Sequence, residues 1–266
     1  MSNRRRQADW RAVVTNRITE ILGQSAPIAT KLPIDPRDFC GLCGVLAIEE
    51  RMMIPEAAIE PVSGGFKIYI QSNFAENSNL RLRRRFSLAH ELCHTFFYDK
   101  SVNPPKRIPF SPQGEAVEAL CHLGASLLLV PTQTLKRDLD RLDGPPTAHD
   151  AIELANRFDV SLETMLRSIQ RATENSAIDH ALILFSTQGE PSVVASYSGP
   201  WLKTTLATPH YGQSWRAFLS RAIGSADAFP MHGFVKIFPT GRLTAKVTAA
   251  SKHRCILELR QEPTLI

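Results

Sequence analysis

The sequence predicts an α+β fold built from a mainly helical part with a small sheet, a helix-turn-helix-like helical segment and a C-terminal α+β part. Apolar residues recur at helical spacing over residues 8–23 and 113–130. They alternate with polar residues over 66–71, and strand-like runs dominate after His180. We place the three parts at residues 1–135, 136–175 and 176–266.

Length and composition are those of an ordinary globular protein. The 266 residues suffice for two modest domains, and 43% of them are hydrophobic and 21% charged, which excludes a disordered chain. The basic N-terminus precedes no apolar run, and no stretch is long enough to span a bilayer, so we expect neither a secretory signal nor a membrane partner. Five scattered cysteines without a signal favour reduced thiols and a cytoplasmic location.

The N-terminal part is expected to begin with an amphipathic helix over residues 8–23. Prolines then separate it from a short helix near 37–44 and a strand at 45–48. Cys40 and Cys43 form a C-x-x-C in the short helix. No second C-x-x-C or nearby His pair completes a zinc site, so we interpret both as buried structural thiols.

Residues 57–71 read as a β-hairpin whose turn is Ser63-Gly64-Gly65. In its second strand, 66–71, Phe66, Ile68 and Ile70 are expected to face the core. This strand has two alternative roles. It either adds an extended peptide by edge pairing or simply completes a small sheet.

Residues 80–85 carry four arginines at the start of the next helix. Such a run could contact nucleic acid. A solvated helix face is the more common role of a charge run, and we favour it here.

The helix that begins with these arginines contains His90-Glu91-Leu92-Cys93-His94, an H-E-x-x-H. Side chains four apart share one helix face, so both imidazoles can bind one metal ion. Glu91 points about 100° away from His90, where it can take a proton from water on that metal. The helix is apolar on nearly every side and therefore buried, and buried imidazoles need partners. We favour a metal site over a coincidental His pair.

A catalytic zinc site needs a third protein ligand. The H-x-x-G-x-x-H type is excluded, because Phe97 stands in place of the Gly and no His follows. The alternative is a glutamate on helix 113–130, either Glu115 or Glu118. Glu115 lies near the helix start, where a carboxylate is stable in solvent. Glu118 lies in the apolar part of the helix, and we choose it.

Residues 147–171 predict two short helices in a helix-turn-helix-like pattern. Thr147 and Asp150 form a start that resembles a capping box, and Ser161 is expected to cap the second helix. Residues 136–175 carry six basic and eight acidic side chains. Because DNA affinity comes from neutralising phosphates, this acidic balance argues against direct DNA binding.

The C-terminal part is a small α+β region. A helix is expected at 213–222. Strand-like runs occupy 181–185, 193–197, 234–238, 243–247 and 255–259.

Two of these segments carry a family resemblance. R-R-F-S-L-A-H-E-L-C-H at 84–94, followed by V-E-A-L-C-H-L-G-A-S-L-L-L-V-P at 117–131, resembles the ImmA/IrrE family of metallo-endopeptidases. The resemblance covers roughly residues 35–172. The three-part order looks most like the IrrE branch, which implies a GAF-like sensor in the C-terminal part and a zincin-like peptidase fold in the first.

The resemblance implies a role for each site residue. His90, His94 and Glu118 match the family's zinc ligands, and Glu91 matches its general base. Two positions depart from the pattern. Cys93 stands where Gly is common, and His122 stands where Asn or Asp is usual, one turn after Glu118, where it could orient a ligand histidine.

The leading prediction is therefore a cytoplasmic zinc endopeptidase that retains one open metal position. The resemblance implies a helix-turn-helix repressor as protein substrate, whose cleavage derepresses genes of a stress response or a mobile element. His and Glu ligands also admit Mn²⁺. Candidates for stabilising the oxyanion are Tyr98, Tyr69 and His149.

Two alternatives belong to other classes. One is a DNA-binding regulator that uses residues 147–171 and keeps a vestigial metal site. The other is a ligand-sensing transcriptional regulator, in which residues 180–266 bind a small molecule. The second is also compatible with a peptidase that this module controls.

Overall fold

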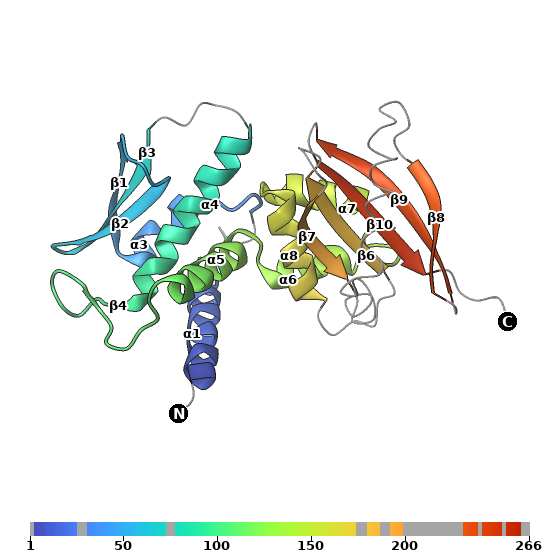
Figure 1. Cartoon of the computed structure of the whole chain (residues 1–266). Coiled ribbons are helices and arrows are strands. Elements are labelled where there is room, and N and C mark those ends of the chain that lie inside the picture. Colours follow the sequence, from blue (N-terminus) through green and yellow to red (C-terminus); the bar gives the residue numbers. More distant parts are fainter. Residues whose placement is uncertain are drawn as a thin grey trace. The chain divides into compact units, whose positions relative to one another are not determined.

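The structure is a computed structural model that describes residues 3–25, 31–72, 78–173, 180–186, 192–198, 231–238, 241–251 and 254–261. The chain divides into two compact units. The first comprises Met1–Thr134 with Arg157–Ser161, and the second comprises Leu135–Asn156 with Leu162–Ile266. The mixed α+β content predicted from the sequence is confirmed (Figure 1). The helix expected at 213–222 lies outside the described residues.

Helices form most of the first unit. The apolar residues Val14, Ile18 and Ile21 of the N-terminal helix are buried, as its spacing predicts. The long central helix α4 packs against α5, and α5 also packs against α1 (Figure 1). In chain order the helices are α1 (Asn3–Gln24), η1 (Pro36–Phe39), α3 (Cys40–Cys43), α4 (Ser78–His94), η2 (Thr95–Phe97) and α5 (Glu115–Leu129).

The first unit also contains a three-stranded sheet of order β1-β3-β2. Its strands are β1 (Val45–Arg51), β2 (Ala57–Val62) and β3 (Gly65–Gln71). Strand β3 pairs in parallel with β1 and antiparallel with β2. Both its edges are therefore occupied, which corrects the idea that this strand adds an extended peptide. Phe66, Ile68 and Ile70 are fully buried, as the alternation predicts.

A two-stranded ladder follows the central helix. Strand β4 (Tyr98–Asp99) pairs antiparallel with β5 (Lys106–Arg107), which places Arg107 directly opposite Tyr98. A further backbone hydrogen bond of 2.9 Å runs from the Ile108 N–H to the Phe97 carbonyl. These bonds hold residues 106–108 of the proline-rich segment 104–112 close to the end of α4.

The arginines at the start of α4 form ion pairs within the first unit, while the side chains of Arg81 and Arg83 remain more than half exposed, as expected for a solvated face. Arg81 is paired with Asp159, Arg83 with Glu56, and Arg84 with Glu50. The guanidinium of Arg85 donates to the Ile34 carbonyl at 2.8 Å. Because carboxylates of the same unit already neutralise these charges, the run is poorly suited to binding phosphates.

The Asp159 carboxylate predicts a pH-dependent part of the stability. Its hydrogen bonds with Arg81, and the charge of Arg85, hold the Asp159 pKa below its ordinary value. A depressed carboxyl pKa stabilises the fold above the unfolded pKa, and this contribution is lost as pH falls through the folded pKa. Asp159→Asn should therefore cost about 1 kcal/mol at pH 7, a value limited by the exposed Arg81.

Denaturant unfolding of both proteins across a pH series tests this expectation. Asparagine tolerates the positive φ of 55° at this position, so the substitution changes charge more than backbone. The two unfolding free energies should differ at neutral pH and converge as pH falls through the depressed folded pKa of Asp159. A difference that stayed constant across the series would contradict the electrostatic cause.

In the second unit, helices α6 (Thr132–Leu139), α7 (Ala148–Phe158) and α8 (Leu162–Ala172) precede a sheet. The first three residues of α6 and the last two of α7 are assigned to the first unit. The expected capping box is confirmed. The Thr147 N–H donates to Asp150 Oδ2 at 2.7 Å, and the Asp150 N–H donates to Thr147 Oγ1 at 3.1 Å. The helix-turn-helix-like role of α7 and α8 stays a prediction, as does the three-part division of the chain.

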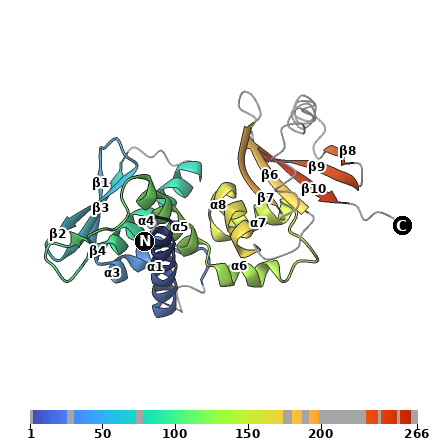
Figure 2. The same ribbon diagram turned by 60° about the horizontal axis from the view of Figure 1, so that its bottom comes forward.

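The sheet of the second unit has the order β7-β6-β10-β9-β8, with every neighbouring pair antiparallel. Helix α8 packs on β7 (Figure 2). Cys255, Ile256 and Leu257 of the central strand β10 are buried, so both faces of that strand are covered. The strands are β6 (His180–Ser186), β7 (Ser192–Ser198), β8 (Met231–Phe238), β9 (Gly241–Ser251) and β10 (Arg254–Gln261).

Among the described residues, no single helix has the length and apolar character needed to cross a membrane. Helices α5 and α6, which are bent by 54° at their junction, reach those limits only as a pair.

Candidate metal centre

Helix α4 presents its two histidines from a nearly closed environment. Leu88, Ala89 and Leu92 are at most 2% exposed, and they fix the helix in the core. The helix ends directly after His94, where the Thr95 hydroxyl donates to the Leu92 carbonyl at 2.7 Å. The packing therefore holds the backbone of the H-E-x-x-H rigidly.

The structure brings His90, His94 and Glu118 together. His90 Nε2 lies 3.1 Å from His94 Nε2 and 3.0 Å from Glu118 Oε2. His94 Nε2 lies 3.6 Å from the other oxygen, Glu118 Oε1. The carboxylate comes from the first turn of α5, which packs directly on α4. Its side chain is 51% exposed, so the three polar groups meet at the surface end of the contact between the helices.

These separations fit a metal ion. Zinc binds nitrogen and oxygen at roughly 2.0–2.2 Å, so neighbouring ligands of a tetrahedral site stand roughly 3.3–3.6 Å apart. The three observed separations, 3.0, 3.1 and 3.6 Å, lie around this range. The Glu115 side chain at the start of α5 is exposed and, within the described residues, forms no hydrogen bond or ion pair with the two histidines.

Burial tunes the protonation of the cluster. It lowers the pKa of His90 to about 4, with the neighbouring His94 and His122 contributing, and it lowers the pKa of His94. Both imidazoles are therefore neutral at pH 7, as metal ligands must be. The Glu91 side chain is also buried, and burial together with the charge of Glu118 raises its pKa to about 7.

Comparison with known proteins finds relatives of the segment that carries these residues. Residues 74–170 match the family model of the IrrE N-terminal-like domain, Peptidase_M78. This segment is similar to the ImmA/IrrE family. The resemblance predicted from the paired motifs is thereby confirmed, and the matched segment contains both α4 and α5.

Two relatives are similar to parts of the chain. The radiation response metalloprotease IrrE of Deinococcus deserti is 32% identical over 116 residues. That match covers 42% of this chain and 40% of the relative's length. A transcriptional regulator of Mycobacterium tuberculosis has a similar fold, with a TM-score of 0.50 and 15% identity over 96% of this chain and 76% of that one.

In the IrrE-like domain, His122 lies beside His90. The hydrogen bond by which His122 was expected to orient a ligand histidine is not found among the described residues. Its ring centroid is 4.7 Å from that of His90 and 5.8 Å from that of Phe86. His90 Nδ1 is buried and has no hydrogen-bond partner in the described part of the chain. His122 therefore touches the His90 ring without orienting it through a hydrogen bond.

The three predicted oxyanion stabilisers are differently placed. The Tyr69 hydroxyl already donates to Glu60 Oε2 at 2.8 Å, and Arg51 covers its ring. His149 belongs to the second unit and lies 3.3 Å from Glu153. Tyr98, four residues after His94, packs edge-on against Phe66. Of the three, only Tyr98 lies close in the sequence to a predicted ligand, His94.

Sequence reasoning missed Arg107. It lies opposite Tyr98 in the short ladder, and its charge contributes to the lowered pKa of His94. Its Nε is buried without a hydrogen-bond partner among the described residues. The basic pair Lys106-Arg107 in the proline-rich segment 104–112 carries no periodic signal, so only the pairing of β4 with β5 reveals the position of Arg107.

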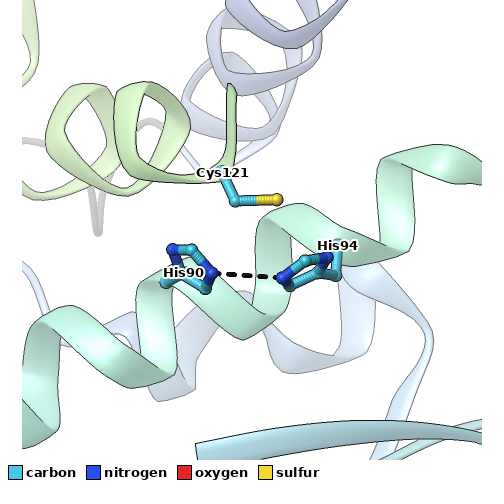
Figure 3. Close-up of side chains that lie close together, drawn as sticks. All are labelled: His90, His94 and Cys121. Carbon is cyan, nitrogen blue, oxygen red and sulfur yellow. Dashed lines mark hydrogen bonds between the residues drawn. The ribbon is translucent and has the colours of Figure 1, made fainter. Parts of the chain in front are cut away.

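Sequence reasoning also treated Cys121 only as a neighbour of Glu118. The ring nitrogens of His90 and His94 and the sulfur of Cys121 all lie within 4.8 Å of one another (Figure 3). The signal in the sequence is its spacing, because positions 118 and 121 share one face of α5.

Proposed function

We propose that this protein is a metal-dependent endopeptidase whose centre is held by His90, His94 and Glu118. The observation that carries the proposal is the convergence of three ligand atoms at 3.0–3.6 Å, with Glu91 next to one of them in the chain. A bound divalent cation would supply a water nucleophile at neutral pH and polarise the scissile carbonyl. Zn²⁺ suits two imidazoles and one carboxylate.

The remaining chemistry belongs to the side chains. Glu91 takes the proton from the attacking water and passes it to the leaving amine. Its buried position keeps bulk water away from that carboxyl group. We propose Arg107, whose charge contributes to the lowered pKa of His94, and Tyr98, its partner in the β4–β5 ladder, as the groups that stabilise charge on the carbonyl oxygen.

The substrate that we propose is a helix-turn-helix transcriptional repressor, which follows from the family resemblance. Cleavage would derepress the repressor's genes in the cytoplasm. The second unit would then serve as a GAF-like module that controls the peptidase through a small ligand. Direct binding of DNA is not part of the proposal, because α7 and α8 lie in an acidic segment and the arginines of α4 are already paired.

Glu118→Gln tests the proposal. The substitution removes one ligand of three and should lower zinc affinity by more than about a hundredfold, since even the outer partners of metal ligands are worth roughly 10–100-fold. Zinc bound after dialysis is the measurement. Cleavage of the helix-turn-helix repressor encoded nearest to the gene should fall in parallel.

Glu115→Gln is the matched control, because it removes an exposed carboxylate from the same helix turn. It should leave zinc content and cleavage unchanged. Equal zinc affinity in the wild type and Glu118→Gln would overturn the ligand assignment. If the zinc-loaded wild type left the repressor intact, the substrate assignment would be wrong.

A further inference from the structure

One β-turn in the segment between α4 and α5 contains a residue that suits it poorly. The Ser111 N–H donates to the Ile108 carbonyl at 3.1 Å, which closes a turn with Pro109 and Phe110 at its centre. Phe110 has a positive φ of 61°. Proline followed by a residue with positive φ is the pattern of a type II turn, whose second central position favours glycine or asparagine. A phenylalanine there carries backbone strain.

The Phe110 side chain is also uncovered. It is 90% exposed, and it alone is aromatic among the exposed large hydrophobic side chains of the described residues. The backbone around it is anchored, because Pro105 and Ser111 are buried on either side. The guanidinium of Arg107 donates to the Pro112 carbonyl and joins the two ends of the turn. The ring therefore projects into solvent from a fixed backbone.

This turn lies close to the proposed metal centre. Arg107, three residues before Phe110, pairs with Tyr98, and its charge contributes to the lowered pKa of His94. Three residues of extended chain reach at most about 11 Å. Shortly after the turn, α5 begins and carries Glu118 in its first turn. A polypeptide bound at the centre can therefore reach Phe110 within a few residues.

Neither exposure nor strain by itself indicates a binding residue. Single exposed hydrophobic side chains are common on protein surfaces. Asp159, which also has a positive φ, belongs to a residue type that tolerates this conformation. Phe110 combines a costly conformation with an apolar ring that its own fold leaves uncovered. Strained residues of this kind cluster at active sites and at positions that hold ligands.

We propose that Phe110 is a substrate-binding residue of the peptidase, whose ring packs on an apolar side chain of the bound polypeptide a few residues from the scissile bond. The proposal rests on the peptidase activity of the proposed function. Aromatic side chains supply large apolar contact areas in interfaces. Phe110 thus favours substrates with an aliphatic or aromatic residue at that position, and it takes no part in the chemistry.

Cleavage kinetics with the helix-turn-helix repressor encoded nearest to the gene test this role. Phe110→Asn removes the ring and suits the positive φ. Its KM should rise about tenfold or more, since that is the affinity lost when a buried Phe ring is removed. Its kcat should stay unchanged, because the ring binds substrate and transition state alike. Its melting temperature should rise by about 2–4 °C as the strain is relieved.

Two variants serve as controls. Phe110→Tyr keeps both the ring and the strain, and it should retain the KM and the melting temperature of the wild type. Ile54→Asn removes a similarly exposed apolar side chain from the connection between β1 and β2, outside the segment between α4 and α5. It should leave KM and kcat unchanged.

The outcomes separate this inference from the proposed function. If the zinc-loaded wild type cleaves the repressor and Phe110→Asn has the same KM, the inference is wrong and the peptidase stands. An equal rise of KM in Ile54→Asn also overturns it. If Phe110→Asn only converts a wild-type dimer into a monomer, at unchanged KM, a second copy of the chain covers the ring instead. A wild type that leaves the repressor intact overturns the substrate assignment together with this inference.

Discussion

Replacing Glu91 with Gln is expected to abolish peptide cleavage while leaving the metal in place. Gln has the size and shape of Glu but cannot accept the proton of the attacking water, and loss of a general base costs roughly 10²–10⁴-fold in rate. Glu91 is buried, and its raised pKa of about 7 shows that the site tolerates a neutral group there. The fold should therefore survive the substitution. Single-turnover cleavage of the repressor measures the effect.

The metal content of this variant gives the decisive comparison. Glu91→Gln should retain one equivalent of zinc, whereas Glu118→Gln should lose it. This separates a residue that moves a proton from one that holds the metal. Cleavage by zinc-loaded Glu91→Gln at the wild-type rate would remove Glu91 from the reaction. Loss of zinc from it would show that the carboxylate acts as a ligand.

Gly124→Ala is expected to destabilise the first unit and to loosen the metal centre. A Cβ at Gly124 would stand 2.6 Å from Cys93 Sγ and 3.1 Å from Val14 Cγ1, closer than side chains pack. Overpacking typically costs 1–3 kcal/mol, which exceeds the gain of roughly 1 kcal/mol from replacing a helical Gly with Ala. We expect a net loss of up to about 2 kcal/mol in the free energy of unfolding.

The same clash should weaken metal binding. Gly124 lets α5 approach α4, so the added methyl group separates the helix of Glu118 from the helix of the two histidines. Zinc affinity should fall together with stability. Denaturant unfolding and a zinc competition assay measure the two effects.

Two further variants isolate the cause. Gly23→Ala is the control, because a Cβ at that helical position meets nothing within 4 Å, and it should be neutral or slightly stabilising. Adding Cys93→Ala to Gly124→Ala removes the clashing sulfur and should recover about 1 kcal/mol as a coupling between the two positions. Gly124→Ala with wild-type stability would show that the helices can separate freely.

The sequence by itself predicted the helix that carries the H-E-x-x-H, its partner helix and the family resemblance. Four-residue spacing placed His90 and His94 on one face, and this holds for any α-helix. The apolar flanks predicted burial, which the structure shows. The choice of Glu118 over Glu115 also came from the sequence, because the two differ in their apolar surroundings. Local periodicity was sufficient for the two helices and their burial, and the choice of Glu118 as a ligand stays a prediction.

Only the tertiary structure decided features that join distant parts of the chain. Pairing fixed β3 as the central strand, which removed the peptide-binding edge proposed for it. Only the packing showed that distant acidic residues form ion pairs with Arg81, Arg83 and Arg84 on this partly solvated face. Cys121 and Arg107 became candidate site residues because the packing of α5 and β5 brings them near the His pair. Sequence periodicity describes a single element, and the distance between elements is set by how they pack.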